Sequence, residues 1–97
     1  MNETEKKYCE NLYKAILKLK SVDDCRKFFE DVCTIKEVLD MSQRLEVANL
    51  LASKKNYQEV SKLTGASTAT ISRVSRCLNY GSGGYALVVD KKEKRYE

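Results

Sequence analysis

Glycine and proline, the residues that most strongly interrupt helices, occupy only two places in this chain. The 97 residues contain no proline, and the four glycines lie at position 65 and, close together, at positions 81, 83 and 84. Between these breaks, apolar residues recur at helical spacing. The sequence therefore predicts an all-α fold, a helical bundle that forms a single domain over residues 1–97.

Residues 56–79 have the pattern of a helix-turn-helix. Asn56 is a good N-cap, and Glu59 at the third helical position completes a near relative of a capping box. Gly65 supplies the left-handed backbone conformation that ends this helix, and Ser67 caps a second one. The apolar residues of the window are spaced so that the two short helices bury one shared seam, formed by Val60, Leu63, Ile71, Val74 and Leu78.

The outer face of the second helix carries small hydroxyl residues, a methyl group and two arginines, and it has no carboxylate to repel phosphate. Such side chains approach base edges and phosphates closely. The residues that we expect to contact DNA are Lys54, Gln58, Lys62, Ser67, Thr68, Ala69, Thr70, Ser72, Arg73 and Arg76. The alternative is an ordinary helical hairpin with a polar outer face.

Positive charge is concentrated in the same part of the chain. The 18 Lys and Arg and 14 Asp and Glu of the whole chain give a net charge of +4. Residues 54–80 hold five of these cations and Glu59 as their one acid, so they account for the same net charge. These residues include the helix-turn-helix, which we call the reading head. A basic patch on such a reading head is the electrostatic footprint of a DNA-binding protein. Because the patch is modest, we expect a homodimer that presents two heads to a palindromic operator in double-stranded DNA.

The remaining helices are predicted from apolar stripes and caps. One helix is expected over residues 3–20, with Leu12 on its stripe, and Ser21 opens a second that ends near Cys33. Thr34 and Glu37 form a capping box for a short third helix that holds Ile35, Val38 and Leu39.

A separate helix is expected over residues 42–53, and its apolar stripe is too broad to pack on one side only. The helices of residues 3–53 are the expected dimerisation region, because one copy cannot cover these stripes. After the glycine-rich break, a C-terminal helix is expected at about residues 84–96, although Tyr85 to Val89 also have strand propensity.

The cysteine pattern does not indicate a metal site. The chain has no Cys-x-x-Cys pair and no histidine, so the usual zinc spacing is missing. Each of the four cysteines falls on an apolar helical face: Cys9, Cys25, Cys33 and Cys77. We expect reduced thiols packed in the core, with a redox or metal role as the alternative, and no cofactor.

Other function classes have little support in the sequence. An enzyme is not expected, because paired carboxylates in an apolar setting, a nucleophile with its base and a phosphate loop are all missing. No apolar run is long enough to span a bilayer, and the first residues do not form a secretory signal, so a soluble cytoplasmic protein is expected. The competing hypothesis is a helical protein-interaction or RNA-binding module; a protein adaptor would lack the steep salt dependence of DNA binding.

Three runs of residues resemble the tryptophan-repressor superfamily, and within it the TrpR-related YerC/YecD proteins of Gram-positive bacteria. They are MSQRLEVA at 41–48, TGASTATISR at 64–73 and CLNYG at 77–81. The similarity covers roughly residues 5 to 95. It implies an all-α, intertwined homodimer in which the N-terminal helices of two chains interleave, two reading heads project, and transcription is regulated in a repressor-like way.

The resemblance also implies an effector pocket. In the tryptophan repressor the corepressor's indole lies between two arginines, which Arg44 and Arg73 resemble here. The family's glycine after the second arginine is Val74, and a serine one turn further on is Cys77. Because valine fills the space that a flat ring needs, we expect no tryptophan binding, and any effector to be another small molecule. The alternatives are an ion pair with a neighbouring acid for Arg44 and a phosphate contact for Arg73.

Overall fold

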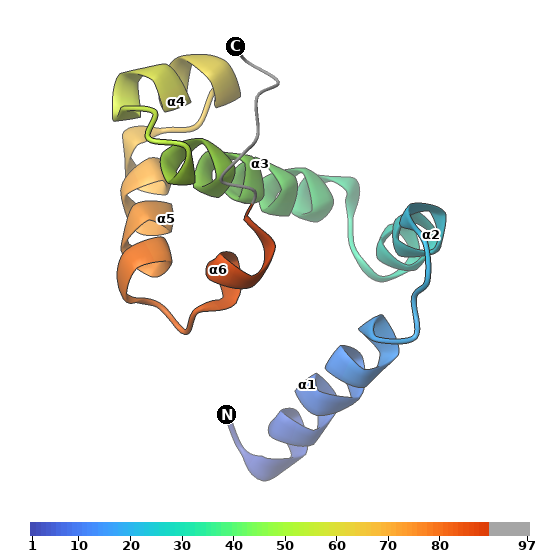
Figure 1. Ribbon diagram of the computed structural model, residues 1–97. Helices are drawn as coiled ribbons and strands as arrows, with labels where there is room; N and C mark the ends of the chain where they lie inside the picture. Colours follow the sequence, from blue (N-terminus) through green and yellow to red (C-terminus); the bar gives the residue numbers. More distant parts are fainter. Residues whose placement is uncertain (90–97) are drawn as a thin grey trace. The chain divides into compact units, whose positions relative to one another are not determined.

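The computed structural model describes residues 1–89, and all of their regular secondary structure is α-helical (Figure 1). This confirms the predicted all-α fold. None of the helices within residues 1–89 is long and apolar enough to span a membrane. The chain divides into two compact units, one ending at Val38 and the other beginning at Leu39. The helices are α1 (Glu3–Ile16), α2 (Val22–Val32), α3 (Ile35–Ala52), α4 (Tyr57–Thr64), α5 (Thr68–Tyr80) and α6 (Gly84–Val88).

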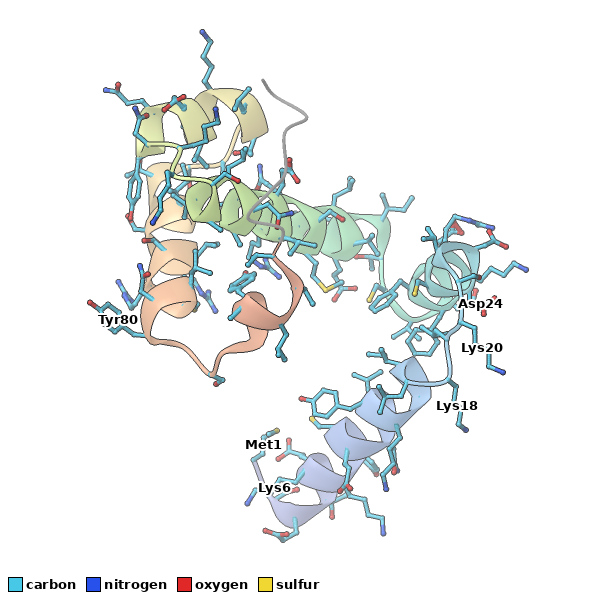
Figure 2. The ribbon with its side chains drawn as sticks, viewed as in Figure 1. Met1, Lys6, Lys18, Lys20, Asp24 and Tyr80 are labelled. Atoms are coloured by element: carbon cyan, nitrogen blue, oxygen red, sulfur yellow. The ribbon has the colours of Figure 1, made fainter. Side chains whose placement is uncertain are left out.

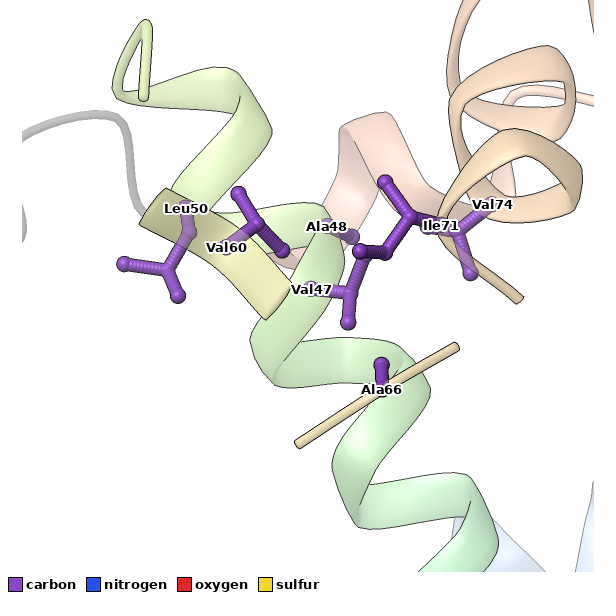
Figure 3. Packing of buried hydrophobic residues seen from close by; sticks show 7 residues of the cluster. All are labelled: Val47, Ala48, Leu50, Val60, Ala66, Ile71 and Val74. Atoms are coloured by element: carbon purple, nitrogen blue, oxygen red, sulfur yellow. The ribbon is translucent and has the colours of Figure 1, made fainter. Parts of the chain in front are cut away.

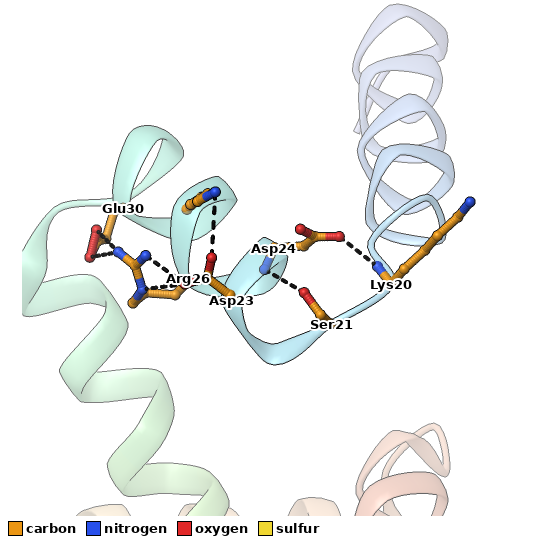
Figure 4. A network of polar contacts seen from close by, with 7 residues as sticks. Lys20, Ser21, Asp23, Asp24, Arg26 and Glu30 are labelled. Atoms are coloured by element: carbon orange, nitrogen blue, oxygen red, sulfur yellow. Dashed lines mark hydrogen bonds and ion pairs between the residues drawn. The ribbon is translucent and has the colours of Figure 1, made fainter.

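Helix α1 ends at Ile16 rather than at Lys20 as the apolar stripe predicts. The backbone tightens at this point, because the Leu19 N–H bonds the Ile16 carbonyl three residues back at 3.1 Å. The Lys20 N–H then donates to the Asp24 carboxylate at 3.1 Å. Ser21 accepts from the Asp24 N–H at 3.0 Å and caps α2, as predicted (Figure 4).

Arg26 is the centre of a charged network on the surface of α2 (Figure 4). Its guanidinium lies 2.6 Å from the Asp23 carboxylate and 3.1 Å from that of Glu30, one helical turn away on either side. Hydrogen bonds to Asp23 and Glu30, together with the charge of Glu30, raise the pKa of Arg26. Exposed ion pairs of this kind add little to stability.

Residues 35–52 form one continuous helix, α3, where the sequence predicts two. The predicted capping box is present: the Thr34 N–H donates to the Glu37 carboxylate at 2.8 Å, and the Glu37 N–H donates to the Thr34 hydroxyl at 3.1 Å. These bonds lower the pKa of Glu37. No glycine or proline lies between Leu39 and Ser42, so the helix continues through the predicted boundary.

Lys54 ends α3 in a left-handed conformation, with φ of 71°, which is the position that glycine usually occupies. The Lys55 N–H bonds the Leu50 carbonyl at 3.1 Å, and the Lys54 N–H bonds the Leu51 carbonyl at 3.0 Å. These are the two hydrogen bonds of a Schellman motif. They explain why a non-glycine residue is held in this conformation.

The buried core lies in the second unit, where α3, α4 and α5 meet (Figure 3). Burial of each Val, Leu or Ile side chain contributes roughly 1.5–3 kcal/mol. The predicted shared seam is correct at Val60, Ile71 and Val74, but Leu63 is 42% exposed and Leu78 is half-buried. The buried apolar residues are Val47, Ala48, Leu50, Val60, Ala66, Ile71 and Val74.

Helix α6 is short and does not extend as predicted. It ends at Val88, and Val89 is extended with ψ of 143°, so a helix over residues 84–96 does not run through this position. Tyr85 and Val89 pack against the core, which favours a turn of helix followed by an extended residue. Residues 90–96 of the predicted helix lie outside the described residues. Helix α5 extends through Tyr80, which projects from its end (Figure 2).

None of the four cysteines is buried, so the predicted packing of thiols in the core is not met within this chain. Cys25 and Cys77 are exposed, and Cys9 and Cys33 are half-buried. All four are free thiols. Their helical faces are apolar, but in α1 and α2 those faces contain no buried residue.

We expect Gly81→Ala to destabilise the protein by roughly 1–3 kcal/mol, because a methyl group cannot be accommodated there. A Cβ atom at this position would overlap the Cys77 carbonyl oxygen, which belongs to the backbone of α5. Gly84 has open space around it, so Gly84→Ala is the matched control and should leave stability unchanged or slightly raised. Urea denaturation measures both. Equal stability of the two variants would contradict the clash.

Candidate nucleic-acid interface

The helix-turn-helix predicted from the sequence is present in α4 and α5. The Asn56 side chain accepts from the Glu59 N–H at 2.9 Å, and the Glu59 carboxylate accepts from the Asn56 N–H at 3.1 Å, which completes a capping box. Gly65 ends α4 in the left-handed conformation, with φ of 72°. Its N–H donates to the Ser61 carbonyl at 2.8 Å. The local pattern of caps and breaks therefore predicts this part of the fold correctly.

Hydroxyl groups hold the turn between the two helices. The Thr64 hydroxyl donates to the Val60 carbonyl at 2.7 Å and accepts from the Ala66 N–H at 3.1 Å. The Ser61 hydroxyl donates to the Ala66 carbonyl at 3.1 Å. Ala66 itself is buried in the core. The turn is therefore held both by the hydrogen bonds of the Ser61 and Thr64 hydroxyls and by the burial of Ala66.

The N-terminal end of α5 carries most of the residues that we predict to contact DNA. Ser67 caps the helix: its hydroxyl accepts from the Thr70 N–H at 3.2 Å and donates to the Thr70 hydroxyl at 3.1 Å. Thr70 and Ser72 are half-buried. The predicted residues of this helix that are exposed are Thr68, Ala69, Arg73 and Arg76. Ser67 and Thr70 therefore also stabilise the N-terminal end of α5 through their hydrogen bonds to each other.

A groove of about 510 Å³ runs between α4 and the start of α5. It brings together three of the predicted residues, Gln58, Lys62 and Thr68, from two helices. Tyr57, 43% exposed, also lines the groove and is not among the residues predicted from the sequence. The sequence signal for Tyr57 is its place directly after the N-cap Asn56, which makes it the first residue of α4. The lining combines the apolar side chain of Ile71 and the ring of Tyr57 with hydroxyl, amide and ammonium groups, and it includes no carboxylate.

Lys54 lies apart from these residues. It lines a separate hollow together with Leu78 and Asn79, which belong to the C-terminal end of α5, whereas Thr68 starts that helix. A helix of 13 residues is about 20 Å long. Lys54 therefore lies near the C-terminal end of α5, whereas Lys62 lies near its N-terminal end. The DNA contact of Lys54 stays a prediction.

The electrostatics of this region favour an anion. Residues 60–89 contain no Asp or Glu, while Lys62, Arg73 and Arg76 are exposed. These three cations lie on α4 and α5. The reading head is therefore positive without any acid in its own helices after Glu59.

Comparison with known proteins places the chain in a family. The model of the family described as Trp repressor protein matches residues 7–93. The chain belongs to the Trp repressor protein family. Its relative YerC of Bacillus subtilis strain 168, described as uncharacterized, is 48% identical over 85 residues, which are 88% of this chain and 82% of YerC.

Two solved structures are similar to this Trp repressor family member in both sequence and fold. A TrpR-like protein from Eubacterium eligens ATCC 27750 is 54% identical, with a TM-score of 0.80 over 84% of each chain. A proposed Trp repressor from Staphylococcus aureus is 39% identical, also with a TM-score of 0.80, over 90% of each chain. These structures support the TrpR-like, all-helical fold.

The residues of the implied effector pocket differ in their surroundings. Val74 is only 1% exposed and belongs to the core with Ile71 and Val47. Arg44, on α3, is half-buried, whereas Arg73 and Cys77, on α5, are exposed. The side chain of Val74 is therefore committed to the core, at the position where the family resemblance implies a glycine.

Proposed function

We propose that this Trp repressor family member is a sequence-specific DNA-binding regulator of transcription. It acts as a homodimer, and each chain binds DNA through α4 and α5. The observation that carries the proposal is the exposed, carboxylate-free N-terminal face of α5 beside a groove lined by Gln58 and Lys62. Small side chains at the start of a recognition helix allow close approach to base edges in the major groove.

The residues of this face have different proposed roles. Thr68, Ala69 and Thr70 read base edges, with Gln58 at the border of the groove, because they are short or carry groups that match bases. Lys62, Arg73 and Arg76 contact phosphates and supply affinity for any sequence. Ser67 and Ser72 contribute hydroxyl groups near the backbone of the DNA.

Dimerisation is proposed from the apolar faces of the first unit. Neither α1 nor α2 contains a buried residue. Tyr8 is 67% exposed and Val32 is 57% exposed, although both lie on the apolar stripes of their helices. A soluble protein rarely leaves such faces uncovered, and the family resemblance implies a second copy as the occupant.

Selection of bound sites from random duplex DNA tests the proposal. The selected sites should form an imperfect palindrome with half-sites about 34 Å apart, because the two-fold symmetry of a dimer is mirrored in its operator. Thr68→Ala should alter the preferred base at particular positions, by roughly 1–3 kcal/mol, while Lys62→Gln should weaken all sites alike.

A selection that yields no preferred sequence would contradict the proposal. A single asymmetric site would contradict the symmetric dimer but not DNA binding. If Thr68→Ala lowered affinity uniformly and left the preferred sequence unchanged, the assignment of the recognition face would be wrong. Selection from random RNA in parallel tests the competing RNA-binding module.

Free tryptophan should neither bind nor strengthen DNA binding. We expect this because the buried Val74 stands where the family resemblance implies a glycine, whose open backbone would leave room for a flat indole ring. Calorimetric titration with tryptophan, with and without operator DNA, measures both effects. A heat signal at submillimolar tryptophan that disappears in Arg73→Ala would contradict this prediction and indicate a tryptophan-dependent regulator.

A further inference from the structure

The side chain of Gln43 links α3 to the turn of the helix-turn-helix. Its amide nitrogen donates to the carbonyl oxygen of Thr64 at 3.0 Å, between residues 21 positions apart in the chain. Thr64 is the last residue of α4, so its carbonyl is among those that the helix itself cannot satisfy. The bond is part-buried. It therefore gives a polar group at the end of α4 a fixed partner on another helix.

Thr64 also makes two hydrogen bonds through its side chain. The Thr64 hydroxyl bonds both the Val60 carbonyl and the Ala66 N–H, at 2.7 and 3.1 Å. Gln43 thus acts on a residue that already joins the end of α4 to the start of α5. Thr64 is therefore bonded on both sides of the turn.

Apolar packing and the hydrogen bond from Gln43 constrain these helices in different ways. Gln43 lies one turn before Val47, which packs in the core with Val60 and Ile71. Burial of apolar surface stabilises contact but is non-directional, whereas a hydrogen bond weakens steeply when its geometry changes. The core packs the helices together, and the bond from Gln43 adds a directional restraint at the end of α4.

We propose that Gln43 is a positioning residue for DNA recognition: it holds the turn at Thr64 against α3, so that α5 presents Thr68 and Thr70 at a fixed angle. Gln43 itself touches no DNA in this proposal. The inference rests on the proposed DNA-binding function, although the link between Gln43 and the turn does not depend on it. Loss of the link should reduce discrimination between sequences more than it reduces binding to all DNA.

The test compares three full-length proteins. Gln43→Met has nearly the same length but lacks the donor, and Gln43→Lys keeps a donor on a long side chain. The first measurement is hydrogen exchange of the Gly65 and Ala66 amides without DNA. The second measurement is the ratio of the affinity for the selected operator to the affinity for a scrambled duplex of equal length. The added charge of Gln43→Lys raises both affinities alike, so it does not change this ratio.

Gln43→Met should accelerate exchange at Gly65 and Ala66 and lower the affinity ratio, each about fivefold, which is the effect of one lost hydrogen bond. Gln43→Lys should restore both. The salt dependence of Gln43→Met should equal that of the natural protein, since no phosphate contact is lost. If Gln43→Met does not fold, Gln43→Asn, whose amide is too short to reach Thr64, replaces it.

An unchanged affinity ratio in Gln43→Met would overturn the proposal even if exchange accelerates, because the bond would then stabilise the turn without affecting recognition. A salt dependence reduced by one phosphate or more would also overturn it, since Gln43 would then contact DNA directly. If the natural protein shows no sequence preference, the proposed function fails, and the exchange measurement still reports whether Gln43 holds the turn.

Discussion

Raising the salt concentration is expected to weaken operator binding by about a thousandfold between roughly 50 and 200 mM. Each reading head exposes Lys62, Arg73 and Arg76, so a dimer places about six cations against phosphates. The expected slope of log affinity against log salt is then about −5. Fluorescence anisotropy with a labelled operator duplex measures this slope directly.

Lys62→Gln should reduce the magnitude of that slope by about two, because each chain of the dimer loses one phosphate contact. Lys27→Gln is the matched control: Lys27 is equally a surface lysine, but it lies on α2 and pairs with Asp23. Lys54→Gln shows whether the cation near the other end of α5 also contacts phosphate. A slope near zero in the natural protein would contradict DNA binding and favour a protein-interaction module.

Sedimentation equilibrium at micromolar concentration should give about twice the chain mass of 11.1 kDa. The proposed interface includes the apolar stripe of α1, on which Leu12 is 40% exposed in the single chain. Leu12→Asp should weaken dimerisation roughly a hundredfold, because an unpaired carboxylate would be buried between the two copies. The variant should therefore sediment close to the mass of one chain.

Leu17→Asp makes the same substitution at the C-cap of α1, directed away from the apolar stripe. Leu17 is 84% exposed, and it lies about half a helical turn from the stripe of Tyr8 and Leu12. This variant should remain dimeric. A well-folded monomer of the natural protein, or equal loss of dimer in both variants, would contradict the interface on α1.

Features that depend on neighbouring residues were predictable. The capping boxes of Asn56 with Glu59 and of Thr34 with Glu37, and the left-handed Gly65, need only a short stretch of chain to form, because each bond closes within one turn. The family resemblance in residues 41–81 follows from the same local runs. The matching family model supports it over residues 7–93.

Element boundaries were less predictable where competing local signals are of similar strength. The sequence predicts a new helix from residue 42, yet α3 continues through Ser42 because no residue there stops a helix. The apolar periodicity of α1 continues to Leu19, but the Lys20 N–H bonds Asp24 of the next helix instead. A periodic pattern reports which face is apolar, and the available caps determine where the helix ends.

The sequence by itself determined the all-α class, the helix-turn-helix and the residues available for a DNA face, because these depend on propensity, caps and charge within short segments. Only the tertiary structure decided that Lys54 lies near the C-terminal end of α5, and that Gln43 holds the carbonyl of Thr64. It also decided that Val74 is committed to the core. Each of these three depends on residues far apart in the chain, and their spatial relation is set by how the helices pack.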